Sequence, residues 1–179
     1  MLPLATLVMI VSLIEREFAA ANGLSYTDQL IVDTGSANTW VGAQKKYVQT
    51  STSVNINRPL SVLNAIGLML GNAYSDTVTF GDNYHIADQL IGNASEYPDL
   101  NGADGVLGIG PVVLSRGTLT NQVRTIIPTV TRSLYTQGTI SQELVSLSFE
   151  PMSSNEFTYG ELTFGTTDTT RYTGAIAWT

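Results

Sequence analysis

One stretch of this chain places a carboxylate in a tight turn. Asp33-Thr34-Gly35-Ser36 follows the apolar run Leu30-Ile31-Val32 and precedes Asn38-Thr39-Trp40-Val41-Gly42. The apolar run predicts a strand that delivers Asp33 to the turn. There the glycine lets the backbone bend, and the hydroxyls of the threonine and serine can hydrogen-bond neighbouring groups. The pattern is typical of one half of an acid–base active site, and a simple Asx-turn in a hairpin uses the same residue types.

The residue types that are scarce or missing exclude other chemistries. The chain of 179 residues has no cysteine and one histidine, His85, so it offers no disulfide, no thiol nucleophile and no histidine cluster. It also has no Gly-x-Ser-x-Gly elbow, no phosphate loop and no His-Glu-x-x-His pattern. We therefore expect no metal and no cofactor, and carboxylate chemistry at Asp33 is what the remaining residues can support.

Composition and charge predict a folded domain that does not bind nucleic acid. Charged residues make up 13% of the chain and hydrophobic residues 43%, which is not the composition of a disordered segment. The length favours one domain with its own core. The net charge of −7 argues against nucleic acid as a partner, because phosphate binding needs clustered lysine and arginine.

The residues around Asp33 closely resemble the first catalytic motif of the pepsin-like aspartic endopeptidases of the fungal type. Residues 104–110, Asp-Gly-Val-Leu-Gly-Ile-Gly, are similar to the family segment that packs beside the catalytic turn, and residues 74–78 resemble the strand that leaves the active-site flap. Three later stretches resemble the segments that close the first lobe of the family; they are residues 134–141, 160–165 and 172–176. The resemblance covers roughly Tyr26 to Trp178.

The resemblance implies an all-β, pepsin-like N-terminal lobe with one or two short helices. It implies that Asp33 is catalytic and that Thr34, Gly35 and Ser36 support its turn. It also implies a polypeptide substrate, with Trp40 and Val106 among the residues that line its binding site.

The flap departs from the family pattern. Members normally carry a Tyr-Gly pair at the flap tip, with the tyrosine hydrogen-bonded to the tryptophan that here is Trp40. Counting back from Gly71 and Tyr74 places Asn64 and Ala65 at these substrate-binding positions. The resemblance therefore predicts a flap that has lost its aromatic latch.

The second catalytic motif is not found in this sequence. Hydrolysis by aspartic proteases needs two carboxylates that share a proton. Asp-Thr-Gly occurs only at Asp33, since Asp76-Thr77-Val78 and Asp168-Thr169-Thr170 lack the glycine. In the resembling family the second motif lies in a second lobe of similar size, so a missing second lobe is the expected partner. We expect this chain alone to be inactive.

Local patterns predict mostly strands. Val145, Leu147 and Phe149 alternate with serines, as in a strand with one buried face. One helix is predicted to follow Pro128, with Val130 and Leu134 on one side and Gly138 as the stop. A shorter helix is predicted around residues 119–124, and the polar stretch 49–59 is predicted to be a loop.

The N-terminal segment, residues 1–21, has two interpretations. Residues 2–14 are uncharged and mostly apolar, too short to span a bilayer, and alanines 19–21 follow. This is typical of a signal peptide, which would make the lobe at residues 22–179 an extracellular protein with no stable membrane span. The other interpretation is that the segment is buried in the fold.

Three functions remain open from the sequence. The first is an aspartic endopeptidase of which this chain, as a truncated form, supplies one catalytic residue. The second is a non-catalytic β domain that keeps the cleft as a peptide-binding groove. The third is a homodimeric protease that supplies Asp33 twice.

Overall fold

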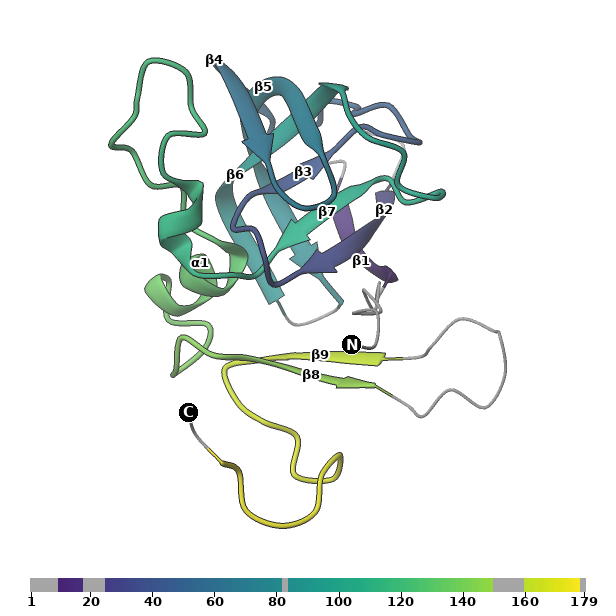
Figure 1. Cartoon of the computed structure of the whole chain (residues 1–179), viewed down its shortest axis with the longest axis vertical. Helices are drawn as coiled ribbons and strands as arrows, with labels where there is room; N and C mark the ends of the chain where they lie inside the picture. Colours follow the sequence, from purple (N-terminus) through teal and green to yellow (C-terminus); the bar gives the residue numbers. More distant parts are fainter. Residues whose placement is uncertain (1–9, 18–24, 82–83, 150–159, 178–179) are drawn as a thin grey trace, which may run out of the picture.

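A curled β-sheet is the largest unit in the part of the chain that the structure describes, and a small second sheet is drawn below it in Figure 1. The computed structural model describes residues 10–17, 25–81, 84–149 and 160–177. The larger sheet contains seven strands in the order β1-β2-β7-β3-β6-β5-β4. Its strands are β1 Ile10–Glu17, β2 Ser25–Asp33, β3 Thr39–Val41, β4 Val54–Leu63, β5 Leu68–Phe80, β6 Tyr84–Glu96 and β7 Gly105–Gly108. The smaller sheet pairs β8 Val145–Phe149 with β9 Gly160–Phe164, and the helices are η1 Val112–Ser115 and α1 Val130–Thr136.

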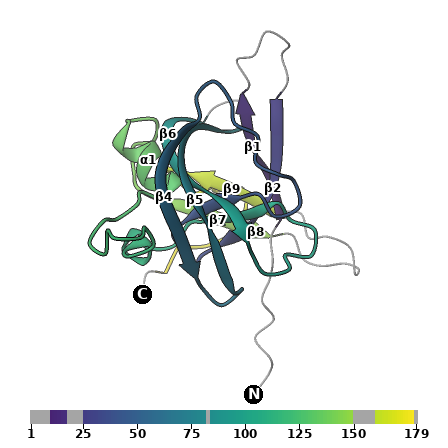
Figure 2. The same ribbon diagram turned by 90° about the horizontal axis from the view of Figure 1, so that it is seen from above.

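The larger sheet bends back on itself. Figure 2 shows β4 and β5 on one side and β1 and β2 on the other. The curl brings β1 close enough to β5 for Glu15 to pair with Thr79. The all-β expectation is confirmed, because strands make up both layers and α1 is the one α-helix among the described residues.

The centre of the sheet explains the apolar run before Asp33. β2 pairs in parallel with β7, and β3 pairs antiparallel with the other edge of β7. Successive side chains of a strand point to opposite faces. Leu30 and Val32 therefore enter one hydrophobic cluster, while Ile31 enters a second cluster on the other face. A strand buried on both faces needs apolar residues at every position rather than at alternate ones.

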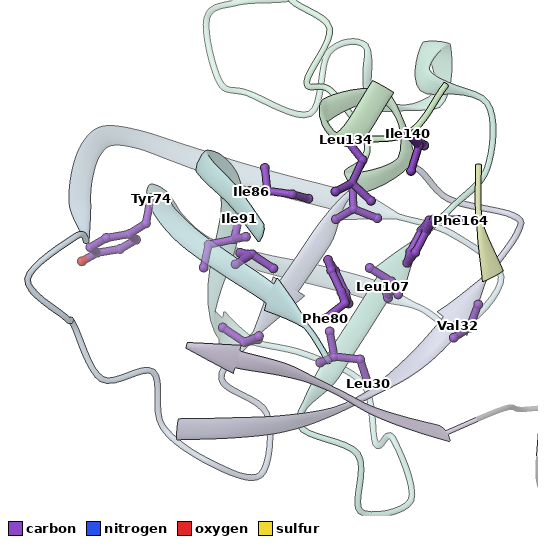
Figure 3. Close-up of a cluster of buried hydrophobic side chains, with 13 residues drawn as sticks. Leu30, Val32, Tyr74, Phe80, Ile86, Ile91, Leu107, Leu134, Ile140 and Phe164 are labelled. Atoms are coloured by element: carbon purple, nitrogen blue, oxygen red, sulfur yellow. The ribbon is translucent and has the colours of Figure 1, made fainter. Parts of the chain in front are cut away.

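The first cluster joins the sheet to the elements that cover it (Figure 3). Leu134 from α1 and Phe164 from β9 pack into it against residues of the larger sheet. The rings of Phe80 and Phe164 lie 5.5 Å apart between centroids. Each large aliphatic or aromatic side chain buried in this way contributes about 1.5–3 kcal/mol. The segments after β7 are thus fixed to the sheet by hydrophobic packing.

The predicted helix is confirmed as α1. Thr129 is its N-cap, and the threonine hydroxyl accepts a hydrogen bond from the Arg132 main-chain N–H. Val130 and Leu134 are buried on one face, and Gly138 adopts a positive φ of 81° just beyond the C-cap. The strand predicted over residues 145–149 is also confirmed, as β8.

Two local predictions were wrong. The stretch 49–59 is not a loop throughout, because β4 begins at Val54 and pairs with β5. The helix predicted at residues 119–124 is absent: these residues form turns, and Leu119 is buried and bridges to Leu60. Burial of Leu119 against the sheet replaces the helical face that the pattern suggested. The short helix lies earlier in the chain, at η1.

Part of the predicted leader forms a strand. Ile10–Glu17 is β1, which pairs antiparallel with β2 from Ile10↔Ile31 to Glu17↔Ser25. Residues 1–9 and 18–24 of the predicted segments lie outside the described residues. Within the described part of the chain, neither helix is long and apolar enough to cross a membrane. Removal of residues 1–21 stays a prediction.

Candidate functional site

Asp33 ends β2 and lies against the loop that follows β7. It pairs with Gly108 in the parallel ladder, and its carbonyl oxygen accepts a 2.9 Å hydrogen bond from the Ile109 N–H. The Gly110 N–H donates to the Ser36 carbonyl oxygen at 2.8 Å. A Cβ added at Gly110 would lie 2.4 Å from the Thr34 carbonyl oxygen, so no side chain fits there. The turn therefore rests on a glycine-lined backbone, as the resemblance of residues 104–110 implied.

The carboxylate of Asp33 is half-buried and uses both of its oxygens. Oδ1 accepts a hydrogen bond from the Gly35 N–H at 2.9 Å, and Oδ2 accepts one from the Asn64 amide Nδ2 at 3.1 Å. Thr34 and Gly35 are exposed at the turn. The Asx-type contact to Gly35 holds the carboxylate in one orientation, and Oδ2 faces the amide of Asn64.

Ser36 supports the turn through its main chain. Its side chain is buried, and Oγ has no hydrogen-bond partner among the described residues. Its carbonyl oxygen, by contrast, receives the Gly110 N–H. In this structure the main chain of Ser36, rather than its hydroxyl, contacts the loop after β7, and its role in supporting a catalytic turn stays a prediction.

The tip of the β4–β5 hairpin lies over Asp33. Asn64 and Gly67 exchange two main-chain hydrogen bonds of 3.2 Å, which leaves Ala65 and Ile66 as a two-residue loop. The side-chain Oδ1 of Asn64 accepts hydrogen bonds from the Ile66 N–H at 3.0 Å and the Gly67 N–H at 3.3 Å. The positions that the sequence assigned to the flap tip are thus found at this turn, with Ala65 exposed.

Trp40 and Val106 lie deeper than the sequence suggested. They are 2% and 0% exposed, and they face each other across the β3–β7 pairing. Both belong to the second hydrophobic cluster, which also contains Leu60 and Met69 from the strands of the hairpin. In this structure they pack against the buried face of the hairpin and present almost no surface to a ligand. Their predicted place as lining residues is corrected accordingly.

Asp76 serves a different environment from Asp33. It is fully buried, and its carboxylate accepts hydrogen bonds from four hydroxyl groups at 2.6–3.0 Å; the donors are Tyr47, Thr50, Thr52 and Ser53. Burial by itself raises the pKa of Asp76, but the hydrogen bonds from Ser53, Thr52, Tyr47 and Thr50 together outweigh it and hold the pKa below its ordinary value. Asp76 therefore fastens the loop after β3 to β5.

Asp168 and Asp104 also have structural partners. The main-chain N–H and the hydroxyl of Thr170 hydrogen-bond Asp168 and hold its pKa below the ordinary value, although the side chain is near the surface. Asp104 is buried and accepts hydrogen bonds from the Gln29 N–H at 2.8 Å and from Lys45 Nζ at 3.1 Å. No local pattern in the sequence indicates the partners of Asp76 or Asp104, because they come from distant segments.

The described residues hold no group of three or more histidine, aspartate or glutamate side chains placed to bind a metal ion. The arrangement at Asp33 provides one half-buried carboxylate. The main chain of its own turn holds one oxygen, and the tip of the β4–β5 hairpin contacts the other. Such a group can accept or donate a proton.

Comparison with known proteins identifies relatives of this arrangement. Residues 25–179 match the family model for eukaryotic aspartyl protease. Polyporopepsin of Irpex lacteus is 51% identical over 153 residues, which are 86% of this chain and 45% of that protein. Secreted aspartic protease 4 of Candida albicans is 30% identical over 169 residues, which are 82% of this chain and 37% of that protein.

A solved structure also shows similarity to an aspartic proteinase. The crystal structure of aspartic proteinase from Irpex lacteus superposes with a TM-score of 0.84 at 46% identity, covering 93% of this chain and 47% of that one. The chain spans less than half the length of the relatives it matches.

Proposed function

This chain belongs to the eukaryotic aspartyl protease family and corresponds to the N-terminal lobe of its members, and we propose that it supplies the first half of an aspartic endopeptidase active site. The observation that carries the proposal is the Asp33 carboxylate, held in a glycine-lined turn beneath a hairpin. Asp33 is the proposed catalytic residue, and Thr34, Gly35 and Ser36 shape its turn.

The proposed reaction is hydrolysis of a peptide bond by two carboxylates. One carboxylate takes a proton from a water molecule that attacks the carbonyl carbon, and the other gives a proton to the carbonyl oxygen. Two neighbouring carboxylates can divide these tasks, because like charges held close together cannot both ionise easily. Asp33 performs one task and needs a second carboxylate within reach of the same water molecule.

A second lobe is the proposed source of the other carboxylate. The chain spans 45% of polyporopepsin and 47% of the matching crystal structure, which leaves room for a second lobe in a complete protein of this family. Asp76 and Asp168, whose motifs lack the glycine, are engaged by hydroxyl and main-chain donors elsewhere in the fold. The proposed substrate is a polypeptide bound between the lobes.

One observation favours a non-catalytic second candidate. Asn64 occupies the flap tip and hydrogen-bonds Asp33 Oδ2, the oxygen that faces the hairpin. A carboxylate oxygen occupied in this way suits a domain that has lost turnover and keeps only peptide binding. The homodimeric alternative is distinguished in the same experiment, since its activity rises with the square of protein concentration.

The experiment joins the chain to the second lobe of polyporopepsin and measures peptide cleavage at acidic pH. We expect the isolated chain to be inactive and the fusion to cleave peptides. The matched control is the fusion with Asp33→Asn, which is expected to lose at least about a hundredfold in kcat/KM, because a single acid–base group contributes about 10²–10⁴-fold. A fusion that binds peptide but cleaves none would support the non-catalytic candidate.

We also propose that the protein is secreted. The support is the apolar stretch at residues 2–14 and the name of a relative, secreted aspartic protease 4. N-terminal sequencing of the protein recovered from culture medium tests it. A product beginning near Asn22 is expected, whereas an intact Met1 on cell-retained protein contradicts cleavage.

A further inference from the structure

The side chain of Asn64 has a fixed orientation. Its carbonyl Oδ1 accepts hydrogen bonds from the main-chain N–H groups of Ile66 and Gly67. Since the turn requires an acceptor on this side, the amide Nδ2 must face the other way, toward Asp33. The hydrogen-bond network therefore defines which end of the amide is the donor at the carboxylate.

The Asp33 carboxylate is equally constrained. Oδ1 is used by the Gly35 N–H within the same turn, so Oδ2 is the oxygen left for the hairpin. The 3.1 Å contact joins a donor to an ionisable acceptor, and bonds to charged groups are stronger than bonds between neutral groups. It also links two segments that lie 31 residues apart in the sequence.

The two faces of the hairpin differ close to its tip. Val62 and Met69, which pair with each other, are buried in the second hydrophobic cluster. Leu63 and Leu68 form the next pair, on the opposite face, and are 77% and 47% exposed. Beside Asn64, the tip also approaches Pro98, whose Cβ lies 2.9 Å from the place where a side chain at Gly67 would begin.

We propose that Asn64 is a positioning residue that fastens the flap directly onto Asp33. The expected aromatic latch is replaced by an amide that uses the carboxylate itself as its anchor. In the catalytic setting, which rests on the proposed function, a substrate must displace Asn64 to reach Asp33 Oδ2. The contact therefore closes the site while no substrate is bound.

The test exploits the chemical symmetry between the two side chains. In Asp33→Asn, the Gly35 N–H still requires an oxygen at the Oδ1 position, which turns an NH2 group toward the Asn64 donor. In Asn64→Asp, the turn keeps its acceptor, but two oxygens face each other. The double variant carrying both substitutions restores a donor opposite an acceptor, with the roles reversed.

Amide hydrogen exchange measured by NMR on the full chain reads out the latch without measuring activity. We expect each single substitution to speed exchange at Ile66 and Gly67 about three- to tenfold, the loss of one hydrogen bond to a charged group at a partly exposed site. The double variant is expected to return to within about twofold of the original rate. The side-chain NH2 resonances of Asn64 are expected to move in Asp33→Ala.

The matched control is Asn72→Ala, an exposed asparagine on β5 of the same hairpin. It is expected to leave exchange at Ile66 and Gly67 unchanged. If Asp33→Ala leaves both the Asn64 NH2 resonances and the tip amides unchanged, Asn64 only closes its own turn and the proposal is wrong. A double variant that exchanges as fast as the singles overturns it too. Neither result bears on whether a two-lobed protein cleaves peptides, so the two proposals fail separately.

Discussion

Two carboxylates of this chain show how surroundings decide what an aspartate does. Asp33 is half-buried at a rim, with one main-chain donor and one amide donor. Asp76 is fully buried and surrounded by four hydroxyl donors. A half-buried carboxylate with two donors becomes available to a substrate or a water molecule when Asn64 moves away, whereas a fully buried carboxylate with four hydroxyl donors can only hold structure. Both aspartates are followed by threonine, but only Asp33 has a glycine at the next position, and their environments differ.

The largest expected effect tests the functional half of this comparison. In a fusion with a second lobe, Asp33→Asn is expected to lower kcat/KM by at least about a hundredfold, because an acid–base group is removed. The same substitution is expected to change the free energy of unfolding by less than about 1 kcal/mol, since the site is partly exposed. Peptide cleavage and urea denaturation of the same preparations measure both. A large loss of stability would place Asp33 in the same structural class as Asp76.

The structural half is tested by Asp76→Ala. Removing the carboxylate leaves buried hydroxyl groups without their acceptor and opens a cavity, so we expect a loss of about 2–4 kcal/mol in the free energy of unfolding. Urea denaturation measures the loss. Asp168→Ala is the control, because Asp168 lies in the segment after β9 near the surface, and a much smaller change is expected there. Equal effects at both positions would contradict the comparison.

The pH dependence of stability separates the two aspartates further. The lowered pKa of Asp76 means that the folded state favours its ionised form. Its contribution is therefore fully present above the unfolded-state pKa of about 3.9 and is lost as the pH falls through the lower folded-state value. We expect the stability gap between the original chain and Asp76→Asn to be constant above about pH 5 and to narrow below about pH 4. A gap that widens on acidification would reverse the sign of the argument.

The sequence predicted those parts of the fold that local patterns determine. The apolar run of β2, the alternation in β8 and the capped helix α1 each carry their own signal, and each is confirmed. β4 was missed at its start because its outward residues are exposed and polar, and it is held by pairing with β5. The helix predicted at residues 119–124 failed for a related reason, since tertiary burial of Leu119 decided its conformation.

The candidate site was predictable in position and less so in contacts. The motif located Asp33, and counting from Gly71 and Tyr74 located Asn64 at the flap tip. The depth of Trp40 could not be read from the sequence, because burial depends on how β3, β6 and β7 come together. The hydroxyl cluster at Asp76 had no local signal either, since its donors lie more than twenty residues earlier.

The smallest expected effect tests whether each hydroxyl donor contributes only part of the stabilisation at Asp76. Ser53→Ala removes one donor at 2.6 Å from Asp76 Oδ2 and the acceptor of the Thr50 main-chain N–H at 2.7 Å, but it leaves the contact to Asp76 Oδ2 from the Tyr47 hydroxyl. We therefore expect a loss of about 1–2 kcal/mol in the free energy of unfolding, the usual contribution of two hydrogen bonds. Ser51→Ala, at an exposed position in the same loop, is the control and is expected to change stability by less than about 0.5 kcal/mol. Urea denaturation of both variants decides the question. If Ser53→Ala lowers the free energy of unfolding as much as Asp76→Ala does, a single donor rather than the cluster keeps Asp76 ionised. The difference between Asp76 and Asp33 would then lie in burial and not in the number of donors.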